Sequence, residues 1–472
     1  MLSRRRFLAG TGALAVATEL GLLDFASSLF AAEFKSAKKP LVQAVFVRPN
    51  VDRYWMGWPG AAYDIKARQA DYTKTLKKAA RKFGVRLEVR SEPLDSEGAV
   101  SAYLEQVKKR PPDGLVVTSA CLHYSGFSSW GLVNNIAKNR GKIPTVVFSP
   151  MGTSFTGHLQ GTRGIDGVFV AATQDIEWLN FGIRMLRTIW EMKNTRICVV
   201  KGDKPEDRVL DVIGTTLHYI PRKRWPEQFR KVQESDEVRA LADYYTKNAK
   251  KIVEPKRQDI LNAAKSYVLA RRIMAAEKCQ GISVDCLPLV ENRLIPCPPC
   301  IAWLRLNDEG SVGACEADWN ATISLRLTSL LFDRPGFMQD PAPNTINNTL
   351  MGAHCSCPTK LDGFDKPPAS FILRSHSESD TGVAPQVLWR IGQKVTVMDF
   401  DGPGKIILGT GRVLRNIETP PAGGCRTSVE LEMDDLADSR DAKGFHQLFI
   451  YGDLELPFKA YCQLAGIKVV HI

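Results

Sequence analysis

The sequence has no internal repeat, no low-complexity segment and, beyond its first thirty residues, no run of 18 consecutive apolar residues. A membrane-spanning helix needs about 20 such residues, so we expect no membrane association beyond that N-terminal segment. Hydrophobic residues make up 44% and charged residues 24% of the 472 positions. This composition excludes a disordered chain, a collagen-like fibre and a small disulfide scaffold. At roughly 100–200 residues per domain, the length predicts two to four domains.

Acidic residues are outnumbered: 63 Lys and Arg stand against 51 Asp and Glu, which gives a formal net charge of +12. Such an excess can indicate a nucleic-acid partner, an anionic membrane surface or acidic ligands. Residues 193–275 alone contain 19 Lys and Arg against 11 Asp and Glu, spread over predicted helices with few aromatic residues among them. This distribution favours a solvated helix face over a nucleic-acid-binding stripe. We therefore expect no nucleic-acid partner.

The first thirty residues are typical of an export signal. The pair Arg4-Arg5 precedes a short apolar stretch that ends near residue 23, and small residues follow at 31–32. This order of charge, apolar run and small residues predicts a cleaved signal peptide over 1–32. The paired arginines resemble a twin-arginine signal, which predicts a periplasmic or extracellular location. The alternative is a basic N-terminus on a buried helix.

Three successive patterns divide the rest of the chain. Over 40–178, short Val- and Ile-rich strands alternate with amphipathic helices, which is typical of a parallel, doubly wound sheet. A second α/β unit is predicted over 179–344. Over 345–472, strands separated by Gly and Pro predict a β-rich, barrel-like domain. The predicted fold is two tandem Rossmann-like α/β domains followed by this β-rich domain.

The densest polar cluster lies between the second and third of these regions. Glu316 stands just before a predicted helix over 318–332, and a predicted strand over 335–340 ends at Asp340. The helix runs about 22 Å at ~1.5 Å per residue, and the strand returns about 20 Å at ~3.3 Å per residue. Two carboxylates distant in the sequence can therefore share one site, with Glu316 beside a helix N-terminus whose dipole favours the ionised form.

Two histidines follow in the C-terminal region. His354 lies in the segment Met-Gly-Ala-His-Cys-Ser-Cys-Pro over 351–358, and His446 directly precedes a predicted strand over 447–451. Carboxylates together with imidazole suit an oxygen-rich octahedral site for Mn²⁺ or Mg²⁺ rather than structural zinc. The alternative is that the acids are surface groups and that each histidine is a hydrogen-bonded core residue.

These segments resemble the L-fucose isomerase and L-arabinose isomerase superfamily, in the order in which that family carries its motifs. The similar segments are Arg48-Pro49-x-x-Asp52 with Gly57, Cys315-Glu316-Ala317-Asp318-Trp319, Phe337-Met338-Gln339-Asp340, His354, Leu373-Arg374-Ser375-His376 and His446. The resemblance implies an aldose–ketose isomerase that acts on a pentose or 6-deoxyhexose through a cis-enediol. It also implies Mn²⁺ or another divalent cation held by Glu316, Asp340 and His446.

The resemblance assigns further roles. Glu316 and Asp340 would move a proton between C1 and C2 of the open-chain sugar. Arg48 and Asp52 would lie near sugar hydroxyls, supplied by a neighbouring subunit because the family's active sites lie between protomers. We therefore expect a homo-oligomer.

Three further residues are candidates for substrate binding. Trp55 offers an apolar face to a sugar ring, and core or subunit packing is an equal alternative. His354 and His376 complete the expected substrate-binding set.

The cysteines are numerous but odd in number, and eleven cannot all pair within one chain. Cys297 and Cys300 form a C-x-x-C, and Cys355 and Cys357 a C-x-C, a combination that fits zinc ribbons poorly. In an exported protein we expect one or two disulfides plus buried thiols. We expect Cys315 and Cys355, which flank candidate site residues, to pack beside the site rather than to act in it.

Two other functions remain open from the sequence. The first is a non-catalytic exported sugar-binding protein on the same scaffold. The second is a periplasmic solute-binding receptor, suggested by two α/β units in tandem, although such receptors require neither the acid pair nor the β-rich region.

Overall fold

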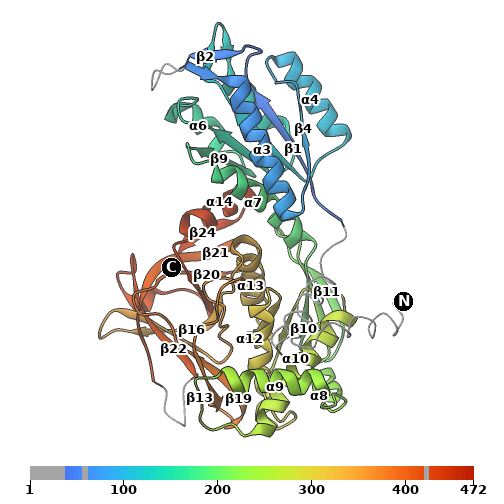
Figure 1. Cartoon of the computed structure of the whole chain (residues 1–472), viewed down its shortest axis with the longest axis vertical. Coiled ribbons are helices and arrows are strands. Elements are labelled where there is room, and N and C mark those ends of the chain that lie inside the picture. The colour runs from blue at the N-terminus through green and yellow to red at the C-terminus, as the bar shows by residue number, and fades with distance from the viewer. Residues whose placement is uncertain (1–37, 56–61, 419–424) are drawn as a thin grey trace, which may run out of the picture.

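The computed structural model describes residues 38–55, 62–418 and 425–472 (Figure 1). The predicted signal peptide over 1–32 lies outside the described residues. Within the described ranges, no helix is both long enough and apolar enough to cross a membrane. The chain is a mixed α/β protein with a parallel N-terminal sheet and a closed barrel in the C-terminal region, which confirms the predicted class and the barrel-like character of that region.

The N-terminal sheet has five parallel strands in the order β4-β1-β5-β8-β9. Their bounds are β1 (Leu41–Val47), β4 (Arg86–Val89), β5 (Gly114–Ser119), β8 (Thr145–Ser149) and β9 (Val168–Ala172). The central strand β5 is buried along its whole length, because helices cover both faces of the sheet. Parallel sheets covered in this way have continuous apolar strands, and for this reason these strands lie within about a residue or two of their predicted positions.

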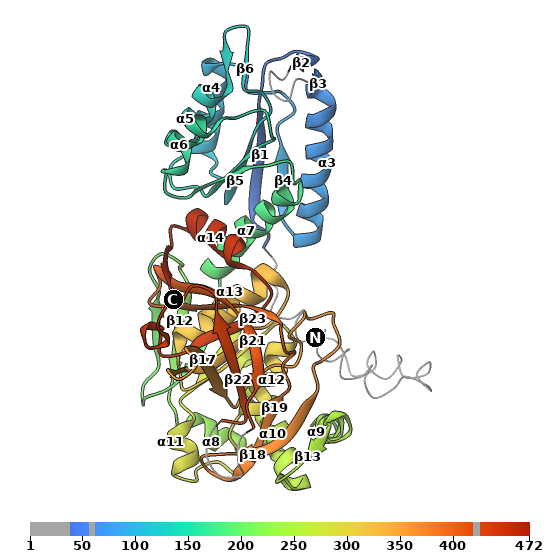
Figure 2. The same cartoon turned by 90° about the vertical axis from the view of Figure 1, so that its left-hand side faces the viewer.

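Helices lie on both faces of this sheet (Figure 2). One face carries α3 (Ile65–Phe83) and α7 (Glu177–Lys193), and the other carries α4 (Glu97–Lys109), α5 (Ser129–Asn139) and α6 (Thr156–Arg163). Short hairpins extend the upper end of the unit in Figure 2. They are β2 (Arg53–Trp55) with β3 (Ala62–Asp64) and β6 (His123–Tyr124) with β7 (Phe127–Ser128).

The second sheet has the order β11-β12-β10-β14-β15, with β11 antiparallel to β12 and the other pairs parallel. Its strands are β10 (Arg196–Val200), β11 (Glu206–Val209), β12 (Thr216–Ile220), β14 (Gly281–Val284) and β15 (Val312–Cys315). The helices of this region are α8 (Arg224–Phe229), α9 (Asp236–Asn248), α10 (Arg257–Ala276), α11 (Leu287–Glu291), α12 (Cys300–Asp308) and α13 (Trp319–Phe332). The last of these, α13, packs against both this sheet and the barrel strand β20.

The C-terminal sheet has seven strands in the order β20-β23-β16-β17-β22-β21-β24, and the first six close into a barrel because β20 also pairs with β21, while β24 pairs with β21 alone. Its strands are β16 (Phe337–Asn344), β17 (Thr349–His354), β20 (Lys394–Phe400), β21 (Lys405–Asn416), β22 (Thr427–Met433), β23 (Gln447–Tyr451) and β24 (Lys468–His471). The long strand β21 allows this arrangement: β24 pairs with its first half and β22 with its second half.

Three features depart from the predicted domain boundaries. The strand β16 pairs with β17 and β23, so the predicted boundary between 344 and 345 divides a barrel hairpin and the barrel begins at β16. A small sheet, β13-β18-β19, pairs Lys251–Ile252 of the second region with Phe371–His376, which pairs in turn with Thr381–Val387. The C-terminal helix α14 (Glu455–Ala465) packs against β9 and α7 of the N-terminal unit. These contacts join segments too distant in the sequence for local patterns to reveal.

Candidate metal centre

The site begins at the carboxyl end of β15, the edge strand of the second sheet. Glu316 and Ala317 follow this strand with φ of 61° and 52°, the left-handed region that non-glycine residues rarely occupy. Asp318 then caps α13, because its Oδ1 accepts a hydrogen bond from the Ala321 backbone N–H at 3.2 Å. Two left-handed residues and a cap turn the chain sharply, and the turn presents Glu316 and Asp318 from one loop. Ligand sites of α/β sheets gather at such strand ends.

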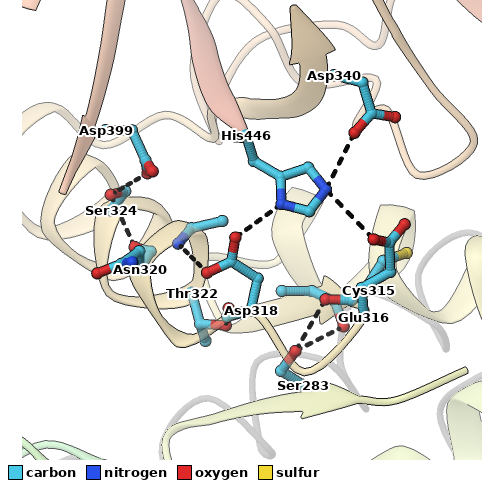
Figure 3. Close-up of polar contacts among 12 residues, drawn as sticks. Ser283, Cys315, Glu316, Asp318, Asn320, Thr322, Ser324, Asp340, Asp399 and His446 are labelled. Carbon is cyan, nitrogen blue, oxygen red and sulfur yellow. Dashed lines mark hydrogen bonds and ion pairs between the residues drawn. The ribbon is translucent and has the colours of Figure 1, made fainter. Parts of the chain in front are cut away.

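His446 lies between the carboxylates of this loop and of β16 (Figure 3). Its ring is buried from solvent, and Nδ1 lies 2.7 Å from Oδ2 of Asp318. On the other side, Nε2 lies 3.1 Å from Oδ1 of Asp340 and 3.6 Å from Oε2 of Glu316. The structure therefore brings together Glu316, Asp340 and His446, the three residues predicted as metal ligands, and adds Asp318 as the partner of the histidine.

The ionisation of these groups is strongly coupled to their contacts. Burial alone would lower the pKa of His446, but its contacts with Asp318 and Asp340 raise that pKa to about 10. Burial alone would raise the pKa of both aspartates, but the contact with His446 lowers the pKa of each below its ordinary value. In the metal-free protein at neutral pH, His446 is therefore an imidazolium between carboxylates.

His354 approaches the same site from the end of β17. Its Nε2 lies 3.6 Å from Oε1 of Glu316, while its Nδ1 accepts a hydrogen bond from the Cys355 backbone N–H at 2.9 Å. Burial alone would lower the pKa of His354, but the Glu316 carboxylate raises it. Since Nδ1 is an acceptor, any proton on this ring is on Nε2, which faces Glu316.

The donor set fits a divalent cation. Single ligand atoms of Glu316, His354 and His446 all lie within 4.8 Å of one another. The Nε2 atoms of both histidines are buried and have no aligned hydrogen-bond partner, which is costly for a polar atom unless something fills the gap. Carboxylate oxygen and imidazole nitrogen are ligands of Mg²⁺, Mn²⁺ and zinc-like ions, so these residues do not by themselves select Mn²⁺.

The two histidines differ in how they can bind. A metal-bound histidine usually donates its other ring N–H to a carboxylate or carbonyl, which leaves the ligating nitrogen unprotonated. His446 has this arrangement, since Nδ1 faces Asp318. His354 has the opposite one, since its Nδ1 accepts from the backbone. The geometry therefore favours His446 as a ligand and His354 as a hydrogen-bond donor.

A narrow pocket opens beside this cluster, with an internal volume of about 40 Å³. Besides Glu316, Asp340 and His354, acidic, histidine, cysteine and apolar side chains line it: Cys286, Leu287, Val290, Pro298, Cys300, Cys315, Cys355, His376, Glu378 and Cys425. Burial lowers the pKa of His376 to about 4, so this ring is neutral at physiological pH. Burial and the nearby Glu316 carboxylate raise the pKa of Glu378. Ligand pockets for small molecules are typically about 300–1,000 Å³, so this one has room for a cation and water within one chain.

The candidates from the N-terminal region lie elsewhere. Arg48 follows β1 and is buried. Its Nε donates a hydrogen bond to Oε1 of Gln69 at 2.6 Å, and its Nη1 donates one to the Pro49 carbonyl at 2.8 Å. Asp52 is exposed and pairs with Lys66. Trp55 ends β2, at the end of the molecule farthest from the barrel (Figures 1 and 2). One chain therefore does not bring these three residues to the metal cluster, whereas His354 and His376 do lie at it.

Sequence reasoning missed two kinds of participant. Asp318 was predicted as the first residue of a helix but not as the partner of His446, because that contact joins residues 128 positions apart. The pocket thiols at Cys286 and Cys300, and the carboxylate of Glu378, also escaped prediction. Cys286 follows β14 at the carboxyl end of a parallel strand, a position that could have indicated a site.

The expected disulfides are absent: all eleven cysteines lie within the described residues and all are free thiols. Ten of them are buried, and Cys425 is half-buried. The prediction of one or two disulfides, which rested on the expected export, is therefore wrong for this structure. Among the described residues the cluster of Glu316, His354 and His446 is the one group with metal-binding spacing, so the cysteines form no zinc site here.

Comparisons with known proteins add little. No family model and no curated protein matches this sequence. Among solved structures, a chain described as "putative two-component system response regulator/ggdef domain protein" aligns at 11% identity, covers 52% of this chain and 82% of its own length, and has a TM-score of 0.22. A TM-score this low supports no conclusion about fold or function.

Proposed function

We propose that the chain is an exported, metal-dependent protein of the aldose–ketose isomerase type, acting on a pentose or 6-deoxyhexose. The observation that carries the proposal is the convergence of Glu316, Asp340 and His446 on one point, with Asp318 orienting His446. These residues come from three separate segments. If His446 had only a structural role, its buried Nε2 would be expected to have an aligned hydrogen-bond partner, and it has none. We also propose that the two α/β units are Rossmann-like domains.

Glu316, Asp340 and His446 would hold the cation, and Mn²⁺ is the first candidate. When bound, a divalent cation stabilises negative charge that develops on sugar hydroxyl and carbonyl oxygens. His446 would contribute Nε2, because its Nδ1–H donates a hydrogen bond to Asp318 and leaves Nε2 free to bind the cation. His354 directs its Nε2–H toward Glu316, and this contact orients the carboxylate.

The carboxylates also carry the proton transfer. Isomerisation requires one base to remove the proton from C2 and to return it at C1. Glu316 is anchored on a strained, left-handed turn and therefore keeps its position, whereas the side chain of Asp340 is 47% exposed and faces the opening of the site. Oε2 of Glu316 and Oδ1 of Asp340 both lie near Nε2 of His446. A proton that one carboxylate removes from the sugar can therefore reach the other carboxylate over a short distance.

The small pocket supports an oligomeric enzyme. A space of about 40 Å³ cannot enclose a sugar, so the substrate would extend past Asp340 to the surface. The side chain of Phe445, next to His446, is 77% exposed there, and an exposed aromatic ring of this kind suits a subunit or substrate contact. We propose that a neighbouring copy closes the site and supplies the exposed Asp52, whereas Arg48 is buried within its own unit.

The test uses the full mature chain. We expect the purified protein to bind about one Mn²⁺ per chain and to convert at least one aldopentose or 6-deoxyhexose to the ketose. Glu316→Gln should bind Mn²⁺ far more weakly and abolish turnover, whereas the matched control Glu254→Gln, an acid paired with Arg374 outside the cluster, should keep Mn²⁺ binding.

The outcomes separate the alternatives. Absence of metal binding, or metal binding that Glu316→Gln leaves unchanged, would overturn the metal site. Metal binding with sugar binding but no turnover across the panel would indicate a non-catalytic sugar-binding protein. Sugar binding without metal would favour a solute receptor.

A further inference from the structure

Five cysteine thiols converge on the pocket beside the metal cluster. They come from five separate places: two residues after β14, the start of α12, the end of β15, the residue after β17 and two residues before β22. The five are Cys286, Cys300, Cys315, Cys355 and Cys425. Nothing in the proposed isomerisation uses a thiol, so the convergence calls for its own explanation.

The thiols occur as two contacting pairs. Cys286 and Cys315 hydrogen-bond each other at the ends of the neighbouring parallel strands β14 and β15. Cys355 and Cys425 also hydrogen-bond each other. Contact between two thiols is a precondition for a disulfide bond between them.

The strand register explains why Cys355 and Cys425 meet. In the antiparallel pair β17–β22, His354 lies opposite Thr427. Cys355 is the next residue on one strand, and Cys425 lies two residues before Thr427 on the other. Both therefore lie at the same end of the same strand pair, and they belong to one packed cluster with Cys300 and Ala384.

Accessibility distinguishes the two pairs. Cys286 and Cys315 are both buried, as are all the other thiols except that of Cys425, which is half-buried. A reagent in solution can therefore reach Cys425 first. Exchange requires such access to a sulfur atom.

We propose that Cys355 and Cys425 form a redox-active dithiol, which a small disulfide oxidises to an intramolecular disulfide at the edge of the pocket. The Cys355 thiolate first takes the proton of the Cys425 thiol. The half-buried Cys425 sulfur then attacks one sulfur of the small disulfide, the other sulfur leaves as a thiolate, and Cys355 gives up the proton that it took. The Cys355 thiolate then attacks the Cys425 sulfur and displaces the second small thiolate. Two protons leave the cysteines and are taken up by the two small thiols, so the protein loses two electrons and two protons, and the small disulfide gains them.

The pair lies where its oxidation would affect the site. The Cys355 backbone N–H donates to Nδ1 of His354, and the Cys355 side chain lines the pocket. A disulfide would tie the end of β17, which carries His354, to the start of β22. It would also remove two thiols that otherwise compete for soft cations beside the carboxylates.

The test uses the full chain and oxidised glutathione as the probe. The protein is reduced, freed of reductant, incubated with oxidised glutathione, quenched with acid and alkylated. We expect the protein to lose two of its eleven thiols and peptide mapping to find Cys355 linked to Cys425. Cys355→Ser should instead accumulate a mixed disulfide with glutathione at Cys425, because the second displacement is blocked.

The control is Cys462→Ser, which removes a buried thiol of α14 outside the pocket and should still lose two thiols. Retention of all eleven thiols, or a link that maps to Cys286 and Cys315, would overturn the proposal. If Cys355→Ser does not fold, Cys425→Ser and the mapping of the unmodified chain still decide. The readout needs neither metal nor sugar, so its failure leaves the proposed function standing, and the reverse also holds.

Discussion

Among the residues of the metal cluster, His446 is the side chain whose pKa is most affected by the charges of the site. Its ring is buried, and its contacts with Asp318 and Asp340 raise its pKa from the ordinary 6.5 to about 10. A pKa raised on folding adds stability that is fully present below the unfolded value and is lost as pH rises through the folded value. The free energy of unfolding of the metal-free protein should therefore fall between about pH 6.5 and pH 10.

Urea unfolding of the metal-stripped protein across this range checks the prediction. Other groups also titrate there, so the comparison is with His446→Gln, which should be less stable near pH 6 and should lack most of the decline. Equal slopes in the two proteins would contradict the assignment.

The two histidines should respond differently to the same substitution. His446→Gln removes a proposed ligand and should weaken Mn²⁺ binding by more than the ~10–100-fold typical of lost outer partners. His354→Gln keeps an N–H donor toward Glu316 and should change Mn²⁺ affinity by less than about tenfold. Calorimetric titration with Mn²⁺ measures both. Similar losses would mean that His354 is itself a ligand, with Glu316 and His446.

At the scale of the element, α13 connects helix capping to metal binding. Oδ1 of Asp318 accepts from the Ala321 N–H, while Oδ2 contacts His446. Asp318→Ala should cost about 1 kcal/mol of stability from the lost cap and about 10–100-fold in Mn²⁺ affinity from the lost outer partner. Asp318→Asn keeps an oxygen for the cap, so it should retain most of the stability and still lose metal affinity.

A matched control exists in the N-terminal unit. Asp64 caps α3 in the same way, accepting from the Ala67 N–H at 2.8 Å. Asp64→Ala should therefore lose only the cap, about 1 kcal/mol in thermal or urea unfolding, and should leave Mn²⁺ affinity unchanged, whereas Asp318→Ala also loses the contact with buried His446. If Asp318→Ala also left the affinity unchanged, its contact with His446 would have no part in metal binding.

At the scale of the whole molecule, the loop between β1 and β2 lies at the tip of the N-terminal unit, whereas the metal cluster lies beside β16 in the other half of the molecule (Figure 1). Asp52 can act on a sugar only in the site of a neighbouring copy. Asp52→Asn should therefore lower sugar turnover without changing Mn²⁺ affinity. Lys66→Gln breaks the same exposed ion pair and serves as the control, with turnover near that of the unmodified protein.

Light scattering and steady-state assays on both variants decide this prediction. A protein that is monomeric at assay concentrations yet fully active would contradict it. So would an Asp52→Asn variant with unchanged turnover.

Local patterns accounted for the elements whose sequence carries a complete signal. The strand over Leu41–Val47 and the helix over Trp319–Phe332 were predictable, the first because it is a continuous apolar run and the second because an aspartate caps an apolar helix. The hairpin β16–β17, the sheet that joins β13 to β18, and the packing of α14 on the N-terminal unit were not predictable. Each depends on partners far along the chain.

The sequence by itself determined the α/β character, the barrel-like C-terminal region and the return of Asp340 toward Glu316, because periodicity and element length are local quantities. Only the tertiary structure decided which groups face one another. It placed Asp318 behind His446, turned His354 into a donor through the Cys355 N–H, and gathered free thiols where disulfides were expected. Barrel closure brings the loop after β15, the strand β16 and the residue before β23 to one point, and no local pattern encodes that closure.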